Sequence, residues 1–210
     1  MIFEGEYIYG KRWNGYGKEY KGTNLIFEGE YKNGERWNGK GKEYKYGQLI
    51  YSGGYLNGKR NGKVRIFLDN RKLEFEGEYL NGKKFKGRGK EFFDNGKLRY
   101  KGEYLNGKWN GYGIEFSSSN FTLIYKGNFL KGKWHGIGQE YDEDVNLIFY
   151  GEFLDGIRNG KGIEYYKDGY LKFEGKYLNG KRNGKGKEYY HNGQLAFIGE
   201  YINGERKEMI

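Results

Sequence analysis

The chain has 210 residues and a formal net charge of +10, and only 36% of its residues are hydrophobic. This apolar content argues against a conventional globular core, while 20% aromatic residues argue against disorder, because disordered chains are poor in aromatics. The absence of Cys excludes disulfides and thiolate metal sites, and no apolar run approaches the length of a membrane span. A basic chain of this kind attracts acidic lipids, nucleic acids or proteins.

One sequence pattern recurs about nine times along the chain, and its opening aromatic residue returns every 24 or 25 residues. A fixed period of this length is typical of stacked supersecondary units. We therefore predict a single repeat array over residues 1–210 with a truncated last unit. The units begin near residues 3, 27, 51, 75, 100, 125, 149, 173 and 197.

Each unit contains two strand patterns separated by a turn sequence. In the second unit, Leu25, Phe27 and Tyr31 alternate with polar residues, Asn33-Gly34 turns the chain, and residues 39–44 form the return strand. With 39 Gly and no Pro, every backbone donor remains free for a β-ladder. We predict an all-β fold, an elongated single-layer antiparallel meander of about nine stacked hairpins. Turns between units contain Asn95-Gly96, Asp168-Gly169 and Asn192-Gly193.

Three aromatic columns run through the units, and we expect them to form the core. Rings of adjacent units are expected to meet edge to face or offset, and the glycine columns let a ring lie over bare backbone. An aromatic row is also able to stack nucleic acid bases, but its presence in every unit favours a structural role. Nucleic acid is therefore not an expected partner. The columns begin at Phe3, Tyr7 and Tyr20 and end at Phe197, Tyr201 and Tyr189.

Two units depart from the pattern. The third has Val64-Arg65-Ile66 in its return strand and Gly54 in place of Glu, which indicates altered curvature, a partner patch or sequence drift. The fifth has a longer polar turn at Ser117–Phe121, a candidate flexible seam between two halves.

Residues for catalysis or metal binding are scarce. The two histidines, His135 and His191, belong to different units. A Glu column, Glu19 to Glu188, repeats too regularly for acid/base work, which needs two different environments, and we expect its members to pair with Lys across strands. We predict no enzyme activity, no cofactor and no metal.

A row of basic residues follows the same turn in each unit. The meander is expected to line these residues along one edge, where they match an extended polyanion, or where they merely keep solvated turns from aggregating. We expect these turns to pack against nothing, so that reversing the charge of four of these residues leaves the fold unchanged. The row comprises Lys11, Arg12, Arg36, Lys59, Arg60, Lys83, Lys84, Lys108, Lys133, Arg158, Lys181 and Arg182.

The segment from Tyr100 to Lys108, followed by Gly111-Tyr112-Gly113, recurs with small changes throughout the chain. This pattern resembles the MORN (membrane occupation and recognition nexus) repeat, although only His135-Gly136 keeps the His-Gly often found in the family. Most units have Asn-Gly instead, and the Tyr-Tyr-x-Asn-Gly-x-Leu ending, as at Tyr189 to Leu195, is similar to variant repeats of some bacterial proteins. The resemblance implies a non-catalytic hairpin array of the kind attached elsewhere to lipid kinases, junctional membrane proteins and cytoskeletal scaffolds.

Two functions stay open. The first is a scaffold for protein partners or for self-association, including a homodimer through the end strands. The second is a peripheral membrane module that binds anionic phospholipids through the basic edge, with Trp13, Trp37, Trp109 and Trp134 as interfacial anchors or as caps of the sheet edge. Since the first unit starts at Phe3 and leaves no room for a signal peptide, we expect a cytoplasmic protein, free or peripheral at a membrane or the cytoskeleton.

Overall fold

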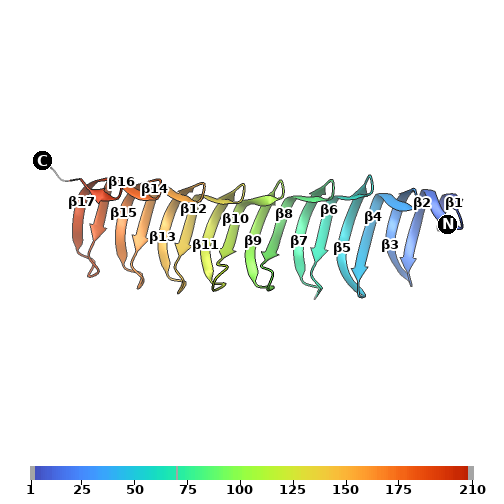
Figure 1. Ribbon diagram of the computed structural model, residues 1–210, viewed down its shortest axis with the longest axis horizontal. Coiled ribbons are helices and arrows are strands. Elements are labelled where there is room, and N and C mark those ends of the chain that lie inside the picture. Colours follow the sequence, from blue (N-terminus) through green and yellow to red (C-terminus); the bar gives the residue numbers. More distant parts are fainter. Residues whose placement is uncertain (1–2, 70, 208–210) are drawn as a thin grey trace. The chain divides into compact units, whose positions relative to one another are not determined.

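The computed structural model describes residues 3–69 and 71–207, and every regular element in these residues is a β-strand. The strands form one open antiparallel sheet of 18 strands joined as a meander, which confirms the predicted fold class (Figure 1). The strands are β1 Phe3–Ile8, β2 Lys11–Lys21, β3 Asn24–Lys32, β4 Glu35–Lys45, β5 Gln48–Leu56, β6 Lys59–Phe67, β7 Leu73–Leu80, β8 Lys83–Phe92, β9 Leu98–Leu105, β10 Lys108–Phe116, β11 Leu123–Leu130, β12 Lys133–Tyr141, β13 Leu147–Leu154, β14 Ile157–Tyr165, β15 Leu171–Leu178, β16 Lys181–Tyr189, β17 Leu195–Ile202 and β18 Glu205–Arg206.

The chain divides into two compact units. The first comprises Met1–Lys90 with Tyr104–Gly107, and the second comprises Glu91–Glu103 with Lys108–Ile210. The Ser117–Phe121 turn, predicted as a seam, lies inside the second unit, where Ser117 N donates to Thr122 O across a closed loop.

A two-residue turn closes the hairpin inside each repeat. In the eighth repeat this turn is Asn179-Gly180, and both residues have positive φ, 51° and 82°. Such a turn matches the right-handed twist of the two strands, and Asn and Gly tolerate the conformation best. It pairs Leu178 with Lys181 and Tyr177 with Arg182, so the residue after Lys181 shares a face with the buried Tyr177.

Glycine stands opposite glycine along the sheet. In β15 and β16 Gly175 pairs with Gly186, and Gly186 pairs in turn with Gly199 of β17. A Cβ on Gly175 or Gly186 would lie 2.5 Å from Cζ of Phe173, because the outer edge of that ring lies over both backbones. The prediction that the glycine columns make room for rings is confirmed, and this is why neither position accepts a side chain.

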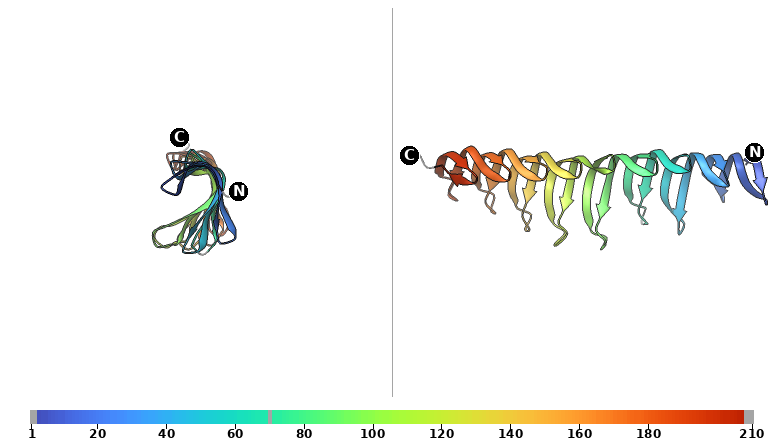
Figure 2. Two further views of the ribbon diagram at one scale, coloured as in Figure 1. Left: turned by 90° about the vertical axis from the view of Figure 1, so that its right-hand side faces the viewer. Right: turned by 45° about the horizontal axis from the view of Figure 1, so that its top comes forward.

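A bulge follows the turn in the return strand. Between the Gly175 and Tyr177 pairs, Lys176 alone stands opposite three residues, 183–185, of β16. Gly184 has φ 82°, which an L side chain adopts only under strain. Bulges of this kind bend a strand and increase its twist, and Figure 2 shows the strands bent along their length.

The first two aromatic columns form the core, as predicted. Phe27, Tyr51, Phe75, Phe149 and Phe173 are completely buried. Most first-column rings meet a second-column ring of their own repeat and one of the next, edge to face, as in Phe173 with Tyr177 at 5.6 Å and with Tyr201 at 5.1 Å between ring centroids. Such pairs add roughly 0.5 to 1.5 kcal/mol each beyond the burial of area. The third column differs from the prediction, since its rings are half-buried or exposed, as with Tyr20 at 46%.

Within the described residues, asparagine side chains bind five of the repeats to the repeat that follows. Asn159 Oδ1 accepts the backbone N–H of Asn179 at 3.2 Å, and Gly180 N donates to the neighbouring Arg158 O at 2.9 Å. The same asparagine contact joins Asn183 to the Asn203 backbone. The Asn-Gly found here in place of His-Gly therefore has a structural role at the hairpin turn.

Candidate functional site

The predicted basic row divides into two sets that lie on opposite faces. Residues directly after the turn are exposed, and residues one position later are half-buried on the core face, because neighbours along a strand alternate between faces. The exposed set comprises Lys11, Lys59, Lys83, Lys108, Lys133 and Lys181. The half-buried set comprises Arg12, Arg36, Arg60, Lys84, Arg158 and Arg182.

Each member of the half-buried set covers the first-column ring of its own repeat. The Arg182 guanidinium lies 4.2 Å from the Phe173 ring centroid, and the Arg158 guanidinium lies 4.4 Å from that of Phe149. The aromatic face attracts a cation at this distance. These cations therefore complete the core.

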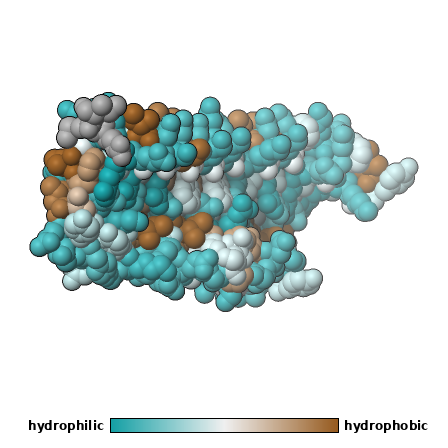
Figure 3. Space-filling view, turned by 60° about the vertical axis from the view of Figure 1, so that its left-hand side comes forward, coloured by the Kyte–Doolittle hydropathy of each residue, from teal (hydrophilic) through white to brown (hydrophobic). Residues whose placement is uncertain are grey.

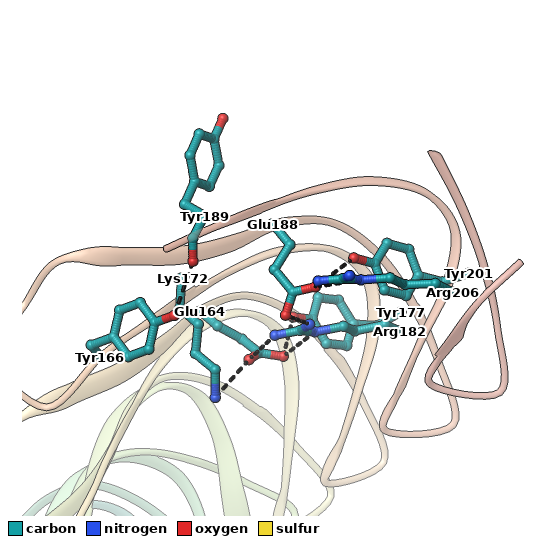
Figure 4. Close-up of polar contacts among 9 residues, drawn as sticks. All are labelled: Glu164, Tyr166, Lys172, Tyr177, Arg182, Glu188, Tyr189, Tyr201 and Arg206. Atoms are coloured by element: carbon teal, nitrogen blue, oxygen red, sulfur yellow. Dashed lines mark hydrogen bonds and ion pairs between the residues drawn. The ribbon is translucent and has the colours of Figure 1, made fainter. Parts of the chain in front are cut away.

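Most of the half-buried arginines pair with a carboxylate of the preceding repeat, and Arg182 also pairs with one of its own repeat. Arg182 Nη2 lies 2.8 Å from Glu164 Oε2, and its Nη1 lies 2.8 Å from Glu188 Oε1 (Figure 4). Tyr177 donates its hydroxyl hydrogen to Glu164 at 2.6 Å, and Tyr201 donates to Glu188 at 3.0 Å. The side chains of Arg182 and Glu164 are each only 14% exposed, so this network is largely shielded from water.

Two expectations are corrected by this arrangement. The turns do pack, because Arg60 lies over Tyr51 at 4.4 Å and Lys84 lies over Phe75 at 5.3 Å. Reversing these two charges would place carboxylates over buried rings, so the fourfold charge reversal is not neutral for the fold. The Glu column pairs mainly with arginine of the next repeat rather than with Lys across the strand, as in Glu19 with Arg36 at 2.9 Å.

Tryptophan replaces the cation in two repeats. Trp109 stacks on Tyr100 at 4.3 Å with an angle of 4°, and Trp134 stacks on Tyr125 at 4.4 Å with an angle of 7°. Trp134 Nε1 donates to Glu115 at 2.6 Å, in the place of the arginine. Trp109 is only 8% exposed, so it is a core residue and not an interfacial anchor.

The third repeat fills its core differently. Val64 and Ile66 are buried at 3% and 9% exposure, which makes them core residues and not a partner patch. In several other repeats a Glu at the position of Ile66 faces the cation of the next repeat, and these contacts together form a carboxylate ladder. Ile66 has no carboxylate, and Lys84 of the next repeat pairs instead with Glu74 at 3.0 Å. The carboxylate has moved to the neighbouring strand.

The carboxylates of this ladder have shifted pKa values. Burial acts to raise the pKa of Glu164, but hydrogen bonds from Arg182 and Tyr177 outweigh it and hold the pKa below its usual value. Burial likewise opposes the shift at Glu188, where hydrogen bonds from Arg182, Arg206 and Tyr201 lower the pKa to about 2. At Glu115 burial prevails and the pKa is raised, since its partner Trp134 carries no charge.

Acid should therefore weaken the ladder. A carboxylate with a lowered pKa in the folded state stabilises the fold above its unfolded pKa and loses that contribution as the pH falls through its folded pKa. We expect the urea midpoint to fall steadily between about pH 4.5 and pH 2, monitored by circular dichroism, and to fall less in Glu188→Gln. A midpoint that is constant or rises over this range would contradict the role of the ladder.

Sequence reasoning missed a row of exposed apolar residues beside the turns. Leu56, Leu80, Leu154, Leu178 and Ile202 are 45 to 52% exposed, and each precedes the two turn residues of its repeat. Leu178 is paired with Lys181, so apolar and basic side chains adjoin on this edge. The recurring Tyr-Leu-Asn-Gly string was the available signal.

The face opposite the rings contains shallow grooves over the glycine pairs. One in the second unit, about 700 Å³, is lined by Lys161, Lys176 and Lys185 with Ile163 and Ile198. One in the first unit, about 660 Å³, is lined by Lys40, Lys42 and Lys63 among others. The paired glycines line these grooves with their backbone only, since a Cβ at Gly175 or Gly186 would point to the ring face.

Residues 3–69 and 71–207 provide little support for a metal site, a histidine cluster or a membrane-spanning helix. No group of three His, Cys, Asp or Glu side chains there is placed to hold a metal ion. His191 Nε2 lies 2.5 Å from Asp168 Oδ2 on exposed loops, and His135 belongs to β12, two repeats earlier. The described residues include no helix with the length and apolar character needed to cross a membrane.

A family model for the MORN repeat matches five segments of the chain, residues 51–63, 100–120, 125–144, 149–169 and 173–195. The chain contains MORN repeats at these five positions. The repeats beginning at Phe3 and Phe27 lie outside these segments and place a cation over a ring, as the matched repeat beginning at Phe173 does. The comparison with curated proteins found no match for this MORN chain.

Proposed function

We propose that the chain is a non-catalytic MORN-repeat scaffold whose repeats act as one array that binds other proteins. The observation that supports it most is the closed core face, where rings, cations and carboxylates are partners of one another in repeat after repeat. The opposite face is open and hollowed over the glycine pairs. A surface of this kind suits contacts spread over several repeats and provides no singular constellation for a reaction.

Self-association through the end strands belongs to the same proposal, because an edge strand offers unpaired backbone groups to a second chain. The array would work in the cytoplasm, free or peripherally bound at a membrane or the cytoskeleton. Light scattering of the purified chain separates self-association from binding to other proteins.

Affinity capture tests the scaffold proposal when each captured protein is then purified and recombined with the chain. Capture is carried out with nuclease and detergent present, which removes nucleic acid and membranes. The proposal requires at least one protein that forms a complex of fixed stoichiometry on size-exclusion chromatography with light scattering. The proposal would be contradicted if proteins were captured only when detergent is omitted, or if the purified proteins failed to bind the chain again.

A second candidate is a peripheral membrane module, and the turn edge supports it. Exposed lysines adjoin exposed leucines there, and a basic residue near an anionic membrane contributes about 1 kcal/mol. We expect the double variant Lys59→Glu and Lys83→Glu to weaken binding to phosphatidylserine vesicles by more than about tenfold and to keep its fold. Sedimentation with phosphatidylcholine vesicles, with and without phosphatidylserine, measures this effect.

The matched control reverses Lys21 and Lys45, which are exposed at the other ends of β2 and β4. Equal weakening by both double variants would assign the attraction to net charge alone. Absence of wild-type binding at low salt would exclude the membrane candidate, because electrostatic attraction is strongest there.

A further inference from the structure

Lys176 stands at a position that is acidic in most repeats. The equivalent residues are Glu6, Glu30, Glu78, Glu103, Glu152 and Glu200, with Gly54 and Asn128 as the remaining exceptions. Glu at this position supports the bulge, since Glu152 Oε1 accepts the backbone N–H of Lys161 at 3.2 Å and Glu30 accepts from Asn38 Nδ2 at 2.6 Å. Lysine is able to accept neither bond.

The substitution creates a cluster of positive charge on the face opposite the rings. Lys161 of β14 and Lys176 of β15 are directly paired across the strands, and Lys185 of β16 lines the same groove. Like charges directly opposite one another destabilise a sheet. Among the residues that the structure describes, no carboxylate forms an ion pair with any of the three, whereas the neighbouring Lys187 pairs with Glu174 at 3.0 Å.

The cluster lies in a groove with apolar ends. Ile163 and Ile198, the latter 61% exposed, line the groove together with the three lysines. The two carboxylates of the lining are occupied, because Glu174 pairs with Lys187 and Glu200 pairs with Lys207 at 3.1 Å. Figure 3 shows that hydrophilic residues cover most of the visible surface, with apolar residues in small separate patches.

We propose that this groove binds a short acidic segment of a partner protein, with its carboxylates among Lys161, Lys176 and Lys185 and an apolar side chain against Ile163 or Ile198. The inference rests on the proposed scaffold function and names the surface and the partner's chemistry. The groove crosses β14 to β17, about 14 Å at three strand spacings, which accommodates about four residues of extended chain. A bilayer surface meets projecting turns before it meets a groove in the face of a sheet, so the recess favours a peptide.

The test uses the full chain and a fluorescein-labelled peptide, Glu-Leu-Glu-Leu-Glu, with Gln-Leu-Gln-Leu-Gln as the neutral probe. Fluorescence anisotropy is expected to show at least tenfold weaker binding of the acidic probe to Lys176→Glu than to the wild-type chain. The variant restores the residue that six repeats already have, so its fold is secure. Lys126→Glu is the matched control, because it makes the same charge change on β11 at a position where other repeats have Glu4, Glu28, Glu76 and Glu174.

Binding of the acidic probe should change less than twofold in Lys126→Glu, and amide shifts in a heteronuclear NMR spectrum should concentrate at Gly162, Gly175 and Gly186. Equal weakening in both variants, no binding of the acidic probe, equal binding of the neutral probe, or shifts at the turn lysines would each overturn the assignment. The assignment would also be overturned if Lys176→Glu weakened binding of phosphatidylserine vesicles or RNA more than it weakened binding of the acidic probe. None of these outcomes decides the scaffold proposal, which is tested separately by mixing each purified captured protein with the chain.

Discussion

Phe173→Ala is expected to lower the free energy of unfolding by about 3 to 5 kcal/mol, the usual cost of deleting a fully buried aromatic ring. The ring is completely buried, meets Tyr177 and Tyr201 edge to face, and carries Arg182 on its surface. The cavity has little means of collapse, because the floor beneath the ring is glycine backbone.

Urea unfolding monitored by circular dichroism and by tyrosine fluorescence measures this effect. Tyr190→Ala is the control, because its side chain is 58% exposed and should change stability by no more than about 0.5 kcal/mol. In a repeat array, loss of the Phe173 ring should unfold the neighbouring repeats first. The transitions monitored by circular dichroism and by tyrosine fluorescence should then no longer coincide. Equal effects of the two variants would show that the rings are not the core.

Arg182→Glu is expected to cost about 3 kcal/mol or more, comparable to breaking a buried ion pair. The new carboxylate would stand between Glu164 and Glu188, both of which now accept hydrogen bonds from Arg182. Their lowered pKa values depend on this arginine, so the variant should also reverse the sign of the acid response and gain stability as these carboxylates are protonated.

Lys181→Glu is the matched control, since it makes the same charge change at the adjacent, exposed position. Its free energy of unfolding should stay within about 0.5 kcal/mol of the wild-type value. If the two variants unfold alike, the distinction between exposed and half-buried basic residues has no energetic basis. Thermal unfolding by calorimetry at pH 7 provides the comparison.

The repeated part of the fold was predictable because each signal recurred in every unit. The period placed Phe27 and Tyr31 in the same column, and Asn33-Gly34 marked a hairpin turn, so strands and core followed. The period did not predict that Lys59 is exposed while Arg60 is half-buried, because both belong to the same basic row. This difference depends on the two-residue turn, which pairs Arg60 with the core residue Tyr55 and turns it inward.

The partner of each carboxylate was harder to foresee. Glu164 belongs to the column that was predicted to pair with Lys across strands, yet its partner Arg182 lies 18 positions along the chain in the next repeat. The order of charged residues in the sequence does not show whether a Glu pairs with a Lys across the strand or with an Arg of the next repeat. The groove lysines required a different comparison, of Lys176 with Glu at the same position of other repeats, and the pairing with Lys161 needed the register of β14 and β15.

The ladder that joins each repeat only to the next also makes the number of repeats adjustable. Within the second unit, removing residues 149–172 would join Ile148 to Phe173 and bring Arg182 to Glu140 in place of Arg158. Tyr177 would then meet the Tyr125 ring in place of Phe153. Gene duplication or loss in whole steps of 24 residues therefore lengthens or shortens such a chain without the need for any new kind of contact.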